Sequence, residues 1–421
     1  MYEAPLTALV LSGGGARAAY QVGVLRAISR LRRQALGTAS HLPNPFGVIC
    51  GTSAGALNAM ALATHADRYD EAVESIAQVW ENFSADQVYR ADSLGVIRSG
   101  AQWLTMVSVG WVIARWRRAR PKSLLDNAPL QQLLEQMVPL ERMPAMFRQG
   151  HLHAVAVTTS SYTSGEHCTF YDSAAPISPW RRSQRLALAG PITQPHLLAS
   201  SAIPFVFPAT ALTTAGQHGW FGDGSMRQTA PLSPAIHLGA QRLLIIGAGR
   251  LHEPTGRVVA DAGYPNLAQI AGHAMSSIFL DALAVDVERM RRINRTLALL
   301  PSTVLNDTDL RPLEALVIAP TQRLDDIAAR HLGALPAPVR ALLRGVGVGG
   351  SGEQARGAAL ASYLLFEAPY TRELMALGEA DTDARQSEVL RFFGWDVARP
   401  ARPAGSDFAN TSRAALDLAL P

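Results

Sequence analysis

The chain has 421 residues, of which 48% are hydrophobic and 17% are charged, and its formal net charge is +4. This length supports a sizeable core and more than one structural unit, and so small a charge gives no sign of a nucleic-acid binder. Two cysteines, Cys50 and Cys168, are too few for a disulfide framework or a cysteine-based zinc site. No signal sequence precedes the first strand pattern and no apolar run reaches the roughly 18 residues that span a bilayer. We therefore expect a cytoplasmic protein, or one that leaves the cell through a system that reads other signals.

The N-terminal part of the chain predicts a strand, a glycine loop and a helix in direct succession. Thr7–Leu11 is typical of a buried strand, and Ser12–Tyr20 (SGGGARAAY) leads from it into an amphipathic helix. Such a loop presents backbone N–H groups at a helix N-terminus and therefore forms an anion site. One use is dinucleotide binding, since Gly13, Gly15 and Ala18 satisfy G-x-G-x-x-G/A, although the acidic residue expected about 20 positions later is missing. The other use is an oxyanion hole.

The second strand pattern ends in a serine flanked by glycines. Val48–Cys50 is apolar, and Gly51–Gly55 (GTSAG) follows it with the form G-x-S-x-G. A strand that turns sharply into a helix forces close contacts at the corner, and glycines let the serine hydroxyl stand clear. Ala54–Ala63 is rich in alanine and leucine and predicts a helix whose N-terminus lies under Ser53. On its own the pentapeptide fits either a nucleophile or a tight packing corner.

Together the two motifs resemble the patatin-like phospholipases, because Gly13–Arg17 (GGGAR) follows the first strand and Gly51–Gly55 follows the second. The resemblance implies an α/β fold with a three-layer α/β/α core and a mainly parallel sheet. It also implies a serine and an aspartate that act as a pair, with the aspartate in a D-G-[GA] motif far downstream. Asp223–Ser225 (DGS) fits this motif except at its third position, where the serine is small enough to keep the turn. A second departure is Ala18, where many members of the family have glycine.

Two further matches are Ser123–Leu130 and the A-S-x-A-x-P block at Ala199–Pro204. We therefore expect a patatin-like catalytic domain at residues 1–250, a mostly helical region packed on this core at 251–399, and a disordered tail at 400–421. The change of composition after residue 250 to helical patterns and proline-bearing loops is the basis for this division.

The resemblance implies roles for individual residues of this chain. Ser53 is the expected nucleophile, and Asp223 is the base that takes its proton. The expected oxyanion-hole donors are the backbone N–H groups of Gly13, Gly14, Gly15 and Ala54, and the expected supporting residues are Arg17, Gly51, Gly55 and Gly224. For Arg17 three roles are open: bracing the loop, contacting a lipid phosphate, or lying on the surface at the helix start. This chemistry needs neither a metal nor a cofactor.

A tryptophan-containing apolar stretch with a basic end, Trp103–Lys122, is the strongest candidate for membrane contact. Its apolar part is too short to span a bilayer, so it fits a helix that lies among anionic lipid headgroups or a lid over an acyl pocket. A buried core helix with a solvated basic end explains it equally well. Likewise, the apolar and aromatic run Phe205–Pro208 suits either an acyl channel or the core.

Downstream patterns complete the expected core. Leu152–Thr159 and His167–Tyr171 predict two strands joined by a turn, and Arg242–Ile246 predicts a further buried strand. Asn266–Leu300 has the length and period of one or two long helices, and Leu316–Ala319 is typical of a last strand.

The function that these residues indicate is hydrolysis of acyl-ester lipids, as in a phospholipase A or a lysophospholipase, through an acyl-enzyme on Ser53. The expected partner is a phospholipid or another acyl-ester lipid, with peripheral contact to the inner face of the membrane through Trp103–Lys122. Two alternatives stay open. One is a lipid-binding or regulatory module of the same fold without activity, and the other is a Ser-His-Asp esterase or thioesterase that uses His237, His252 or His273.

Overall fold

The computed structural model describes residues 5–37, 42–90, 123–214, 216–251, 264–305, 307–350 and 356–396. The predicted membrane or lid segment Trp103–Lys122 and the predicted tail at 400–421 lie outside these residues. Membrane contact through that segment therefore stays a prediction, and so does the disorder of the tail.

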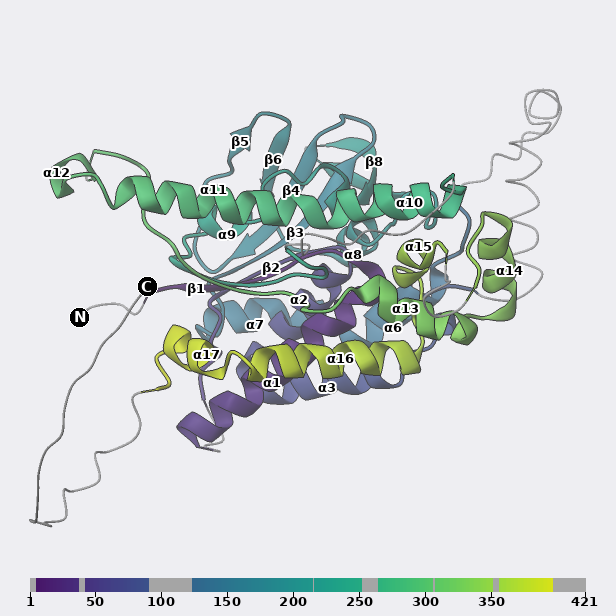
Figure 1. The fold of residues 1–421 in the computed structure, drawn as a ribbon. Coiled ribbons are helices and arrows are strands. Elements are labelled where there is room, and N and C mark those ends of the chain that lie inside the picture. The colour runs from purple at the N-terminus through teal and green to yellow at the C-terminus, as the bar shows by residue number, and fades with distance from the viewer. Residues whose placement is uncertain are drawn as a thin grey trace, which may run out of the picture.

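A ten-stranded mixed sheet runs through the described part of the chain in the order β10-β9-β1-β2-β3-β4-β6-β5, and β8 pairs with β3 and β7 beside this path (Figure 1). Its strands are β1 (Thr7–Leu11), β2 (Val48–Thr52), β3 (Ala154–Ser161), β4 (His167–Ser173), β5 (Arg181–Arg182), β6 (Arg185–Ala189), β7 (Thr210–Thr214), β8 (Gln217–Asp223), β9 (Arg242–Ile246) and β10 (Glu314–Ile318). The predicted strands at Thr7–Leu11 and Arg242–Ile246 are confirmed with the same bounds. The predicted pair of strands is confirmed as the antiparallel pair β3 and β4.

The central strands β10, β9, β1, β2 and β3 are parallel, and every residue of β1 and β2 is buried. Helices cover both faces of these strands, so the sequence shows apolar runs instead of an alternating pattern. Because the strands are parallel, the loops after β1 and β2 emerge at the same edge of the sheet. The glycine loop and Ser53 are therefore neighbours.

Helices cover both faces of the sheet, which confirms the predicted three-layer α/β/α arrangement (Figure 1). The helices are α1 (Ala19–Leu36), α2 (Ala54–Ala63), α3 (Tyr69–Glu81), α6 (Ala128–Met137), α7 (Met143–Arg148), α8 (Gln194–Ser200), α9 (Ser233–His237), α10 (Leu267–Ser276), α11 (Ala282–Leu297), α12 (Ser302–Leu305), α13 (Leu324–His331), α14 (Ala337–Gly345), α15 (Ala358–Ser362), α16 (Ala368–Asp383) and α17 (Gln386–Phe393). α1, α2, α3 and α16 pack on the face that carries Leu9 and Ile49. α9 and α11 pack on the opposite face, which carries Ala8 and Val48.

The region after residue 250 is mostly helical, and it is joined closely to the preceding part of the chain. Its strand β10 continues the central sheet beside β9. Its helix α16 crosses α1 at a point where each helix carries a glycine. A Cβ at Gly23 of α1 would lie 2.0 Å from the carbonyl oxygen of Met375. A Cβ at Gly378 of α16 would lie 2.3 Å from the carbonyl oxygen of Tyr20. The division of domains at residue 250 stays a prediction, but the region beyond it completes the core.

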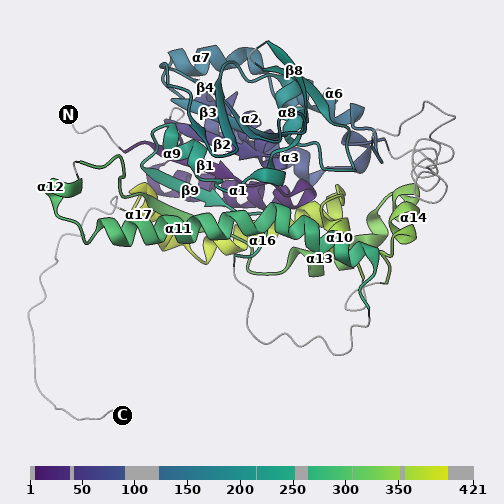
Figure 2. The same cartoon turned by 90° about the horizontal axis from the view of Figure 1, so that it is seen from above.

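The run Leu267–Leu297 is long and apolar enough, by length and composition, to cross a membrane, although no spanning segment is expected from the sequence. It consists of α10 and α11 joined by a π-helical turn, Ser277–Asp281, and Figure 2 shows it as one rod along the molecule. Met275, Phe279 and Leu283 on one side of this rod are buried in the core. A core helix that crosses no membrane passes the same test of length and composition.

Candidate active site

Ser53 occupies the sharp corner between β2 and α2. β2 ends at Thr52, α2 begins at Ala54, and the serine between them has φ 56° and ψ −134°. A positive φ is costly for a residue with a Cβ and is found where the surrounding structure enforces it. The two flanking glycines make this corner sterically possible. A Cβ at Gly51 would lie 2.5 Å from the Cα of Ala56, and one at Gly55 would lie 2.5 Å from the carbonyl oxygen of Ser12.

Asp223 reaches Ser53 from the end of β8. The Ser53 hydroxyl donates a hydrogen bond of 2.5 Å to Oδ2 of Asp223, which lies 170 positions later in the chain. The other carboxylate oxygen accepts a 2.9 Å hydrogen bond from the backbone N–H of Ser225. Gly224 makes this turn possible, because a Cβ there would lie 2.3 Å from the carbonyl oxygen of Thr158.

The Asp223 carboxyl group is fully buried, and Ser53 is 1% exposed. Burial raises the pKa of Asp223 to about 6, while the hydrogen bonds from Ser53 and from the backbone of Ser225 act in the opposite direction. No arginine, lysine or histidine in the described part of the chain contributes to this shift. The carboxylate is therefore ionised at neutral pH yet basic enough to accept a proton from a bound hydroxyl group.

The Ala199–Pro204 block contacts both residues of this pair. The Ser200 hydroxyl accepts a 2.9 Å hydrogen bond from the backbone N–H of Ser53, and the carbonyl oxygen of Ala202 accepts one of 3.1 Å from the backbone N–H of Asp223. The block therefore fixes the backbone of the serine and of the aspartate relative to each other. The sequence match identifies the block but not this contact.

The glycine loop passes directly beside the Ser53–Asp223 pair. A Cβ at Gly13 would lie 3.1 Å from the Cβ of Ser53 and 2.3 Å from the hydroxyl oxygen of Ser225, so a larger residue there would have to displace the Ser225 hydroxyl group. Within the described residues, no group accepts a hydrogen bond from four backbone N–H groups around this point, those of Gly13, Gly14, Gly15 and Ala54. The N–H of Ala54 also lies at the N-terminus of α2, where the helix dipole favours negative charge.

Arg17 is buried at the start of the first helical segment, with 2% of its surface exposed. Its Nε donates a 2.8 Å hydrogen bond to the Ser362 hydroxyl, and its guanidinium group pairs with Asp325 and lies 4.0 Å above the ring of Tyr363. The surface role considered for Arg17 is wrong, because the side chain is enclosed. A contact with a lipid phosphate needs an exposed guanidinium group, so these contacts favour the bracing role.

The same C-terminal segment holds the backbone of the glycine loop. The carbonyl oxygen of Tyr363 accepts a 3.1 Å hydrogen bond from the N–H of Ala16, and a Cβ at Gly15 would lie 2.3 Å from this oxygen. A dinucleotide phosphate would have to displace this contact. Asp325 and Ser362 are not predictable from the sequence as partners of Arg17, because they lie 308 and 345 positions away and belong to no motif.

We expect Arg17→Ala to lower the free energy of unfolding by about 3 kcal/mol, because the substitution breaks a buried ion pair and removes packing over Tyr363. The matched control is Arg30→Ala, whose pair with Asp383 is largely exposed and is expected to contribute less than about 1 kcal/mol. Urea unfolding of both variants measures the difference. Equal losses in the two variants would contradict the bracing role.

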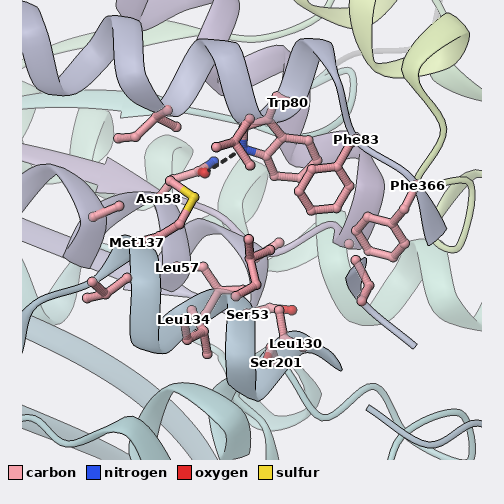
Figure 3. A pocket seen from close by; sticks show the side chains of 18 of the residues that line it. Ser53, Leu57, Asn58, Trp80, Phe83, Leu130, Leu134, Met137, Ser201 and Phe366 are labelled. Carbon is pink, nitrogen blue, oxygen red and sulfur yellow. Dashed lines mark hydrogen bonds between the residues drawn. The ribbon is translucent and has the colours of Figure 1, made fainter. Parts of the chain in front are cut away.

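An apolar pocket opens beside the Ser53 hydroxyl (Figure 3). Its walls come from α2, α3 and α6, from the segments after α3 and α8, and from the segment between α15 and α16. They include Leu57, Trp80, Phe83, Leu134, Met137, Ile203, Phe207 and Phe366. Phe207 of the Phe205–Pro208 run lines the pocket, whereas Phe205 is 71% exposed and does not. A pocket of this chemistry suits a hydrocarbon chain.

Residues 9–236 match the family model described as patatin-like phospholipase, and the match includes Ser53 and Asp223. The chain belongs to the patatin-like phospholipase family. The predicted resemblance is thereby confirmed, and membership of this family supports a lipid hydrolase activity. No curated protein matches the chain.

Several solved structures are distantly similar to this member of the family. VipD from Legionella pneumophila is 13% identical with a TM-score of 0.31, and the match covers 89% of this chain and 67% of VipD. Human GIVD cytosolic phospholipase A2 in complex with methyl gamma-linolenyl fluorophosphonate is 16% identical with a TM-score of 0.42, and the match covers 93% of this chain and 59% of the human one. The type III effector protein ExoU is 15% identical with a TM-score of 0.25, and the match covers 96% and 92% of the two chains. These scores are too low to add to what the family match shows.

Of the three histidines predicted for a Ser-His-Asp arrangement, the two that the structure describes, His237 and His273, make no hydrogen bond with Ser53 in this patatin-like protein. His237 stacks on Trp180 with 4.6 Å between the rings, and its Nδ1 lies 2.8 Å from the carbonyl oxygen of Ser233. His273 is exposed on α10, and His252 lies outside the described residues. In the part of the chain that the structure describes, the hydrogen-bond partner of the Ser53 hydroxyl is a carboxylate.

Proposed function

We propose that the protein is a lipid acyl hydrolase in which Ser53 is the nucleophile and Asp223 is its general base. The observation that carries this proposal is the 2.5 Å hydrogen bond between the two buried side chains, of which Ser53 also lines an apolar pocket. A serine hydroxyl is a weak nucleophile until a neighbouring base takes its proton, and this carboxylate is in contact with it. The proposed activity is that of a carboxylic-ester hydrolase acting on a phospholipid or another acyl-ester lipid.

In the acylation step, Asp223 accepts the hydroxyl proton while the oxygen of Ser53 forms a bond to the carbonyl carbon of the ester. The carbonyl oxygen becomes negatively charged, and the N–H groups of the glycine loop and of Ala54 can donate hydrogen bonds to it. When the tetrahedral intermediate collapses, the bond to the alcohol breaks and Asp223 returns the proton to the leaving alcohol. The acyl group then stays attached to Ser53.

In the deacylation step, the same carboxylate acts on water. Asp223 accepts a proton from a water molecule as the water oxygen attacks the acyl carbon, and a second tetrahedral intermediate forms in the same oxyanion site. Its collapse breaks the bond to the Ser53 oxygen, which regains a proton from Asp223, and the fatty acid is released. One water molecule is consumed and no redox change occurs.

The experiment that tests this proposal compares the purified protein with its Ser53→Ala variant on p-nitrophenyl esters and on phospholipid vesicles. Hydrolysis by the native protein but not by the Ser53→Ala variant supports the proposal. The apolar pocket is also compatible with a module that binds lipid without cutting it. Absence of hydrolysis, together with lipid binding that is equal in both proteins, would favour that module.

We expect the value of kcat/KM for ester hydrolysis to fall about tenfold per pH unit below pH 6, because Asp223 has a pKa of about 6 and only its ionised form can accept the proton. Above this pH the carboxylate is ionised and the rate should level off. The measurement is the release of fatty acid over a pH series, with the Ser53→Ala variant as the background. A rate that stays constant well below pH 6 would exclude a base with a pKa of about 6.

A further inference from the structure

The apolar pocket beside Ser53 is lined largely by residues of three helices. Its helical lining residues are Ala54, Leu57, Asn58 and Ala61 on α2, Ile76, Val79 and Trp80 on α3, and Leu130, Leu133, Leu134 and Met137 on α6. On each helix neighbouring members of this set are one or three positions apart, so each helix presents one face to the pocket along one to two turns. The pocket therefore extends along the helices, away from the serine.

A second hollow borders the pocket at Ala61, about two turns of α2 away from Ser53. That hollow lies outside the pocket and shares Ala61, Ile76 and Met137 with it. In Figure 3 Met137 and Phe366 lie at opposite ends of the lining. The side chains of these three shared residues therefore form a thin partition between the pocket and the second hollow.

The chemistry of the two hollows differs sharply. The pocket is lined almost entirely by hydrocarbon and aromatic groups, whereas the second hollow is also lined by His65, Arg68, Glu71 and Ser75. Arg68 lies 3.5 Å from Glu71, so this hollow contains a solvated ion pair. Transfer of a hydrocarbon chain into such surroundings gains little, so a chain that fills the pocket should stop at the partition.

Met137 is the adjustable part of the partition. Ala61 and Ile76 are buried in the middle of their helices, whereas Met137 is partly exposed and is the last residue of α6. An unbranched thioether side chain has several rotatable bonds and fills irregular gaps, so it can close the end of a pocket without fixing the backbone there.

We propose that Met137 closes the acyl pocket and limits the substrate to a medium acyl chain of about eight carbons. The length follows from α2: the seven steps along the helix from Ala54 to Ala61 span about 10 Å at a rise of about 1.5 Å per residue. Carbon–carbon bonds of about 1.5 Å in an extended zigzag advance about 1.3 Å per carbon. This inference rests on the proposed function, since it identifies the substrate class of the same site.

The test measures kcat/KM for four p-nitrophenyl esters: butanoate, octanoate, dodecanoate and hexadecanoate. The chain-length ratio is kcat/KM for dodecanoate divided by kcat/KM for octanoate. Met137→Ala removes the partition, and we expect the ratio to rise about tenfold or more. Ala61→Leu adds side-chain volume from α2 at the end of the pocket that Met137 closes from α6, and we expect it to shift the preference toward butanoate. Met137→Leu keeps the volume and should keep the native ratio.

Met290→Ala is the matched control, because Met290 is buried in α11 and is not among the residues that line the pocket. It should leave the chain-length ratio unchanged even where it lowers stability. If Met137→Ala and Ala61→Leu both fold and both keep the chain-length ratio of the native protein, the inference is overturned.

Binding measurements separate this inference from the proposed catalytic function. If the native protein hydrolyses no ester, the catalytic proposal fails, and calorimetric titration with octanoate and dodecanoate still tests the pocket. In that case we expect Met137→Ala to improve the binding of dodecanoate relative to octanoate by about tenfold. Equal binding ratios for the native protein and the variant would overturn the inference.

Discussion

Ser53→Ala is expected to reduce ester hydrolysis to the background rate, a loss in kcat of about a million-fold, as is typical when a serine nucleophile is removed. The variant keeps the corner between β2 and α2, because alanine needs no more space than serine and meets the same backbone strain. The residual rate is measured on p-nitrophenyl butanoate, and folding is checked by circular dichroism and urea unfolding.

Ser201→Ala is the matched control for this variant. Ser201 also lines the pocket, but its hydroxyl donates a 2.9 Å hydrogen bond to the carbonyl oxygen of Leu197 and is not bonded to Asp223. We expect its turnover to stay within about tenfold of the native value, because a neutral hydrogen bond contributes only about 1 kcal/mol. Substantial hydrolysis by purified Ser53→Ala would mean that another group attacks the ester.

The parts of the fold that the sequence predicts well are those whose signals are local. A fully buried parallel strand is an uninterrupted apolar run, and Thr7–Leu11 and Arg242–Ile246 therefore appear in the structure with the bounds expected. The short, partly exposed strands β5, β6 and β7 carry no such signal. Arg181–Arg182, for example, consists of two exposed residues whose strand character comes only from pairing with β6.

The site shows the same contrast. Gly51–Gly55 is visible in the sequence because a tight corner restricts every position, whereas Asp223 in a single Asp-Gly pair is indistinguishable from an ordinary turn. Only the family resemblance predicts this aspartate, and the structure then places it in contact with Ser53. The partners of Arg17 and the partition at Met137 depend on how distant helices pack, which no motif in the chain encodes.

Asp223→Asn is expected to abolish turnover, with a loss of about ten-thousand-fold or more in kcat, because an amide oxygen cannot accept the proton of Ser53. The amide is close in size to the carboxylate and can still accept one of the hydrogen bonds from Ser53 and Ser225. The geometry of the turn should therefore survive, and the lost rate should reflect lost basicity. An Asp223→Asn enzyme that turned over at the native rate would exclude the carboxylate as the base.

The same substitution should stabilise the fold at neutral pH. The pKa of Asp223 in the folded state is about 6, compared with 3.8 for an unperturbed aspartate. A raised pKa means that the folded state binds the proton more tightly, so the side chain contributes most to stability below the unfolded pKa and loses this contribution as pH rises through 6. At neutral pH the buried carboxylate therefore lowers the free energy of unfolding by about 3 kcal/mol relative to a neutral group, because a pKa difference of one corresponds to about 1.4 kcal/mol.

Urea unfolding of the native protein and of Asp223→Asn over a pH series measures this cost. The variant should be the more stable protein at neutral pH, and its advantage should shrink as pH falls below about 6, because the native aspartate then becomes neutral as well. An advantage that does not depend on pH would show that the effect comes from packing and not from the buried charge. Higher stability combined with lost turnover is the expected signature of a buried group that is retained for catalysis at the expense of the fold.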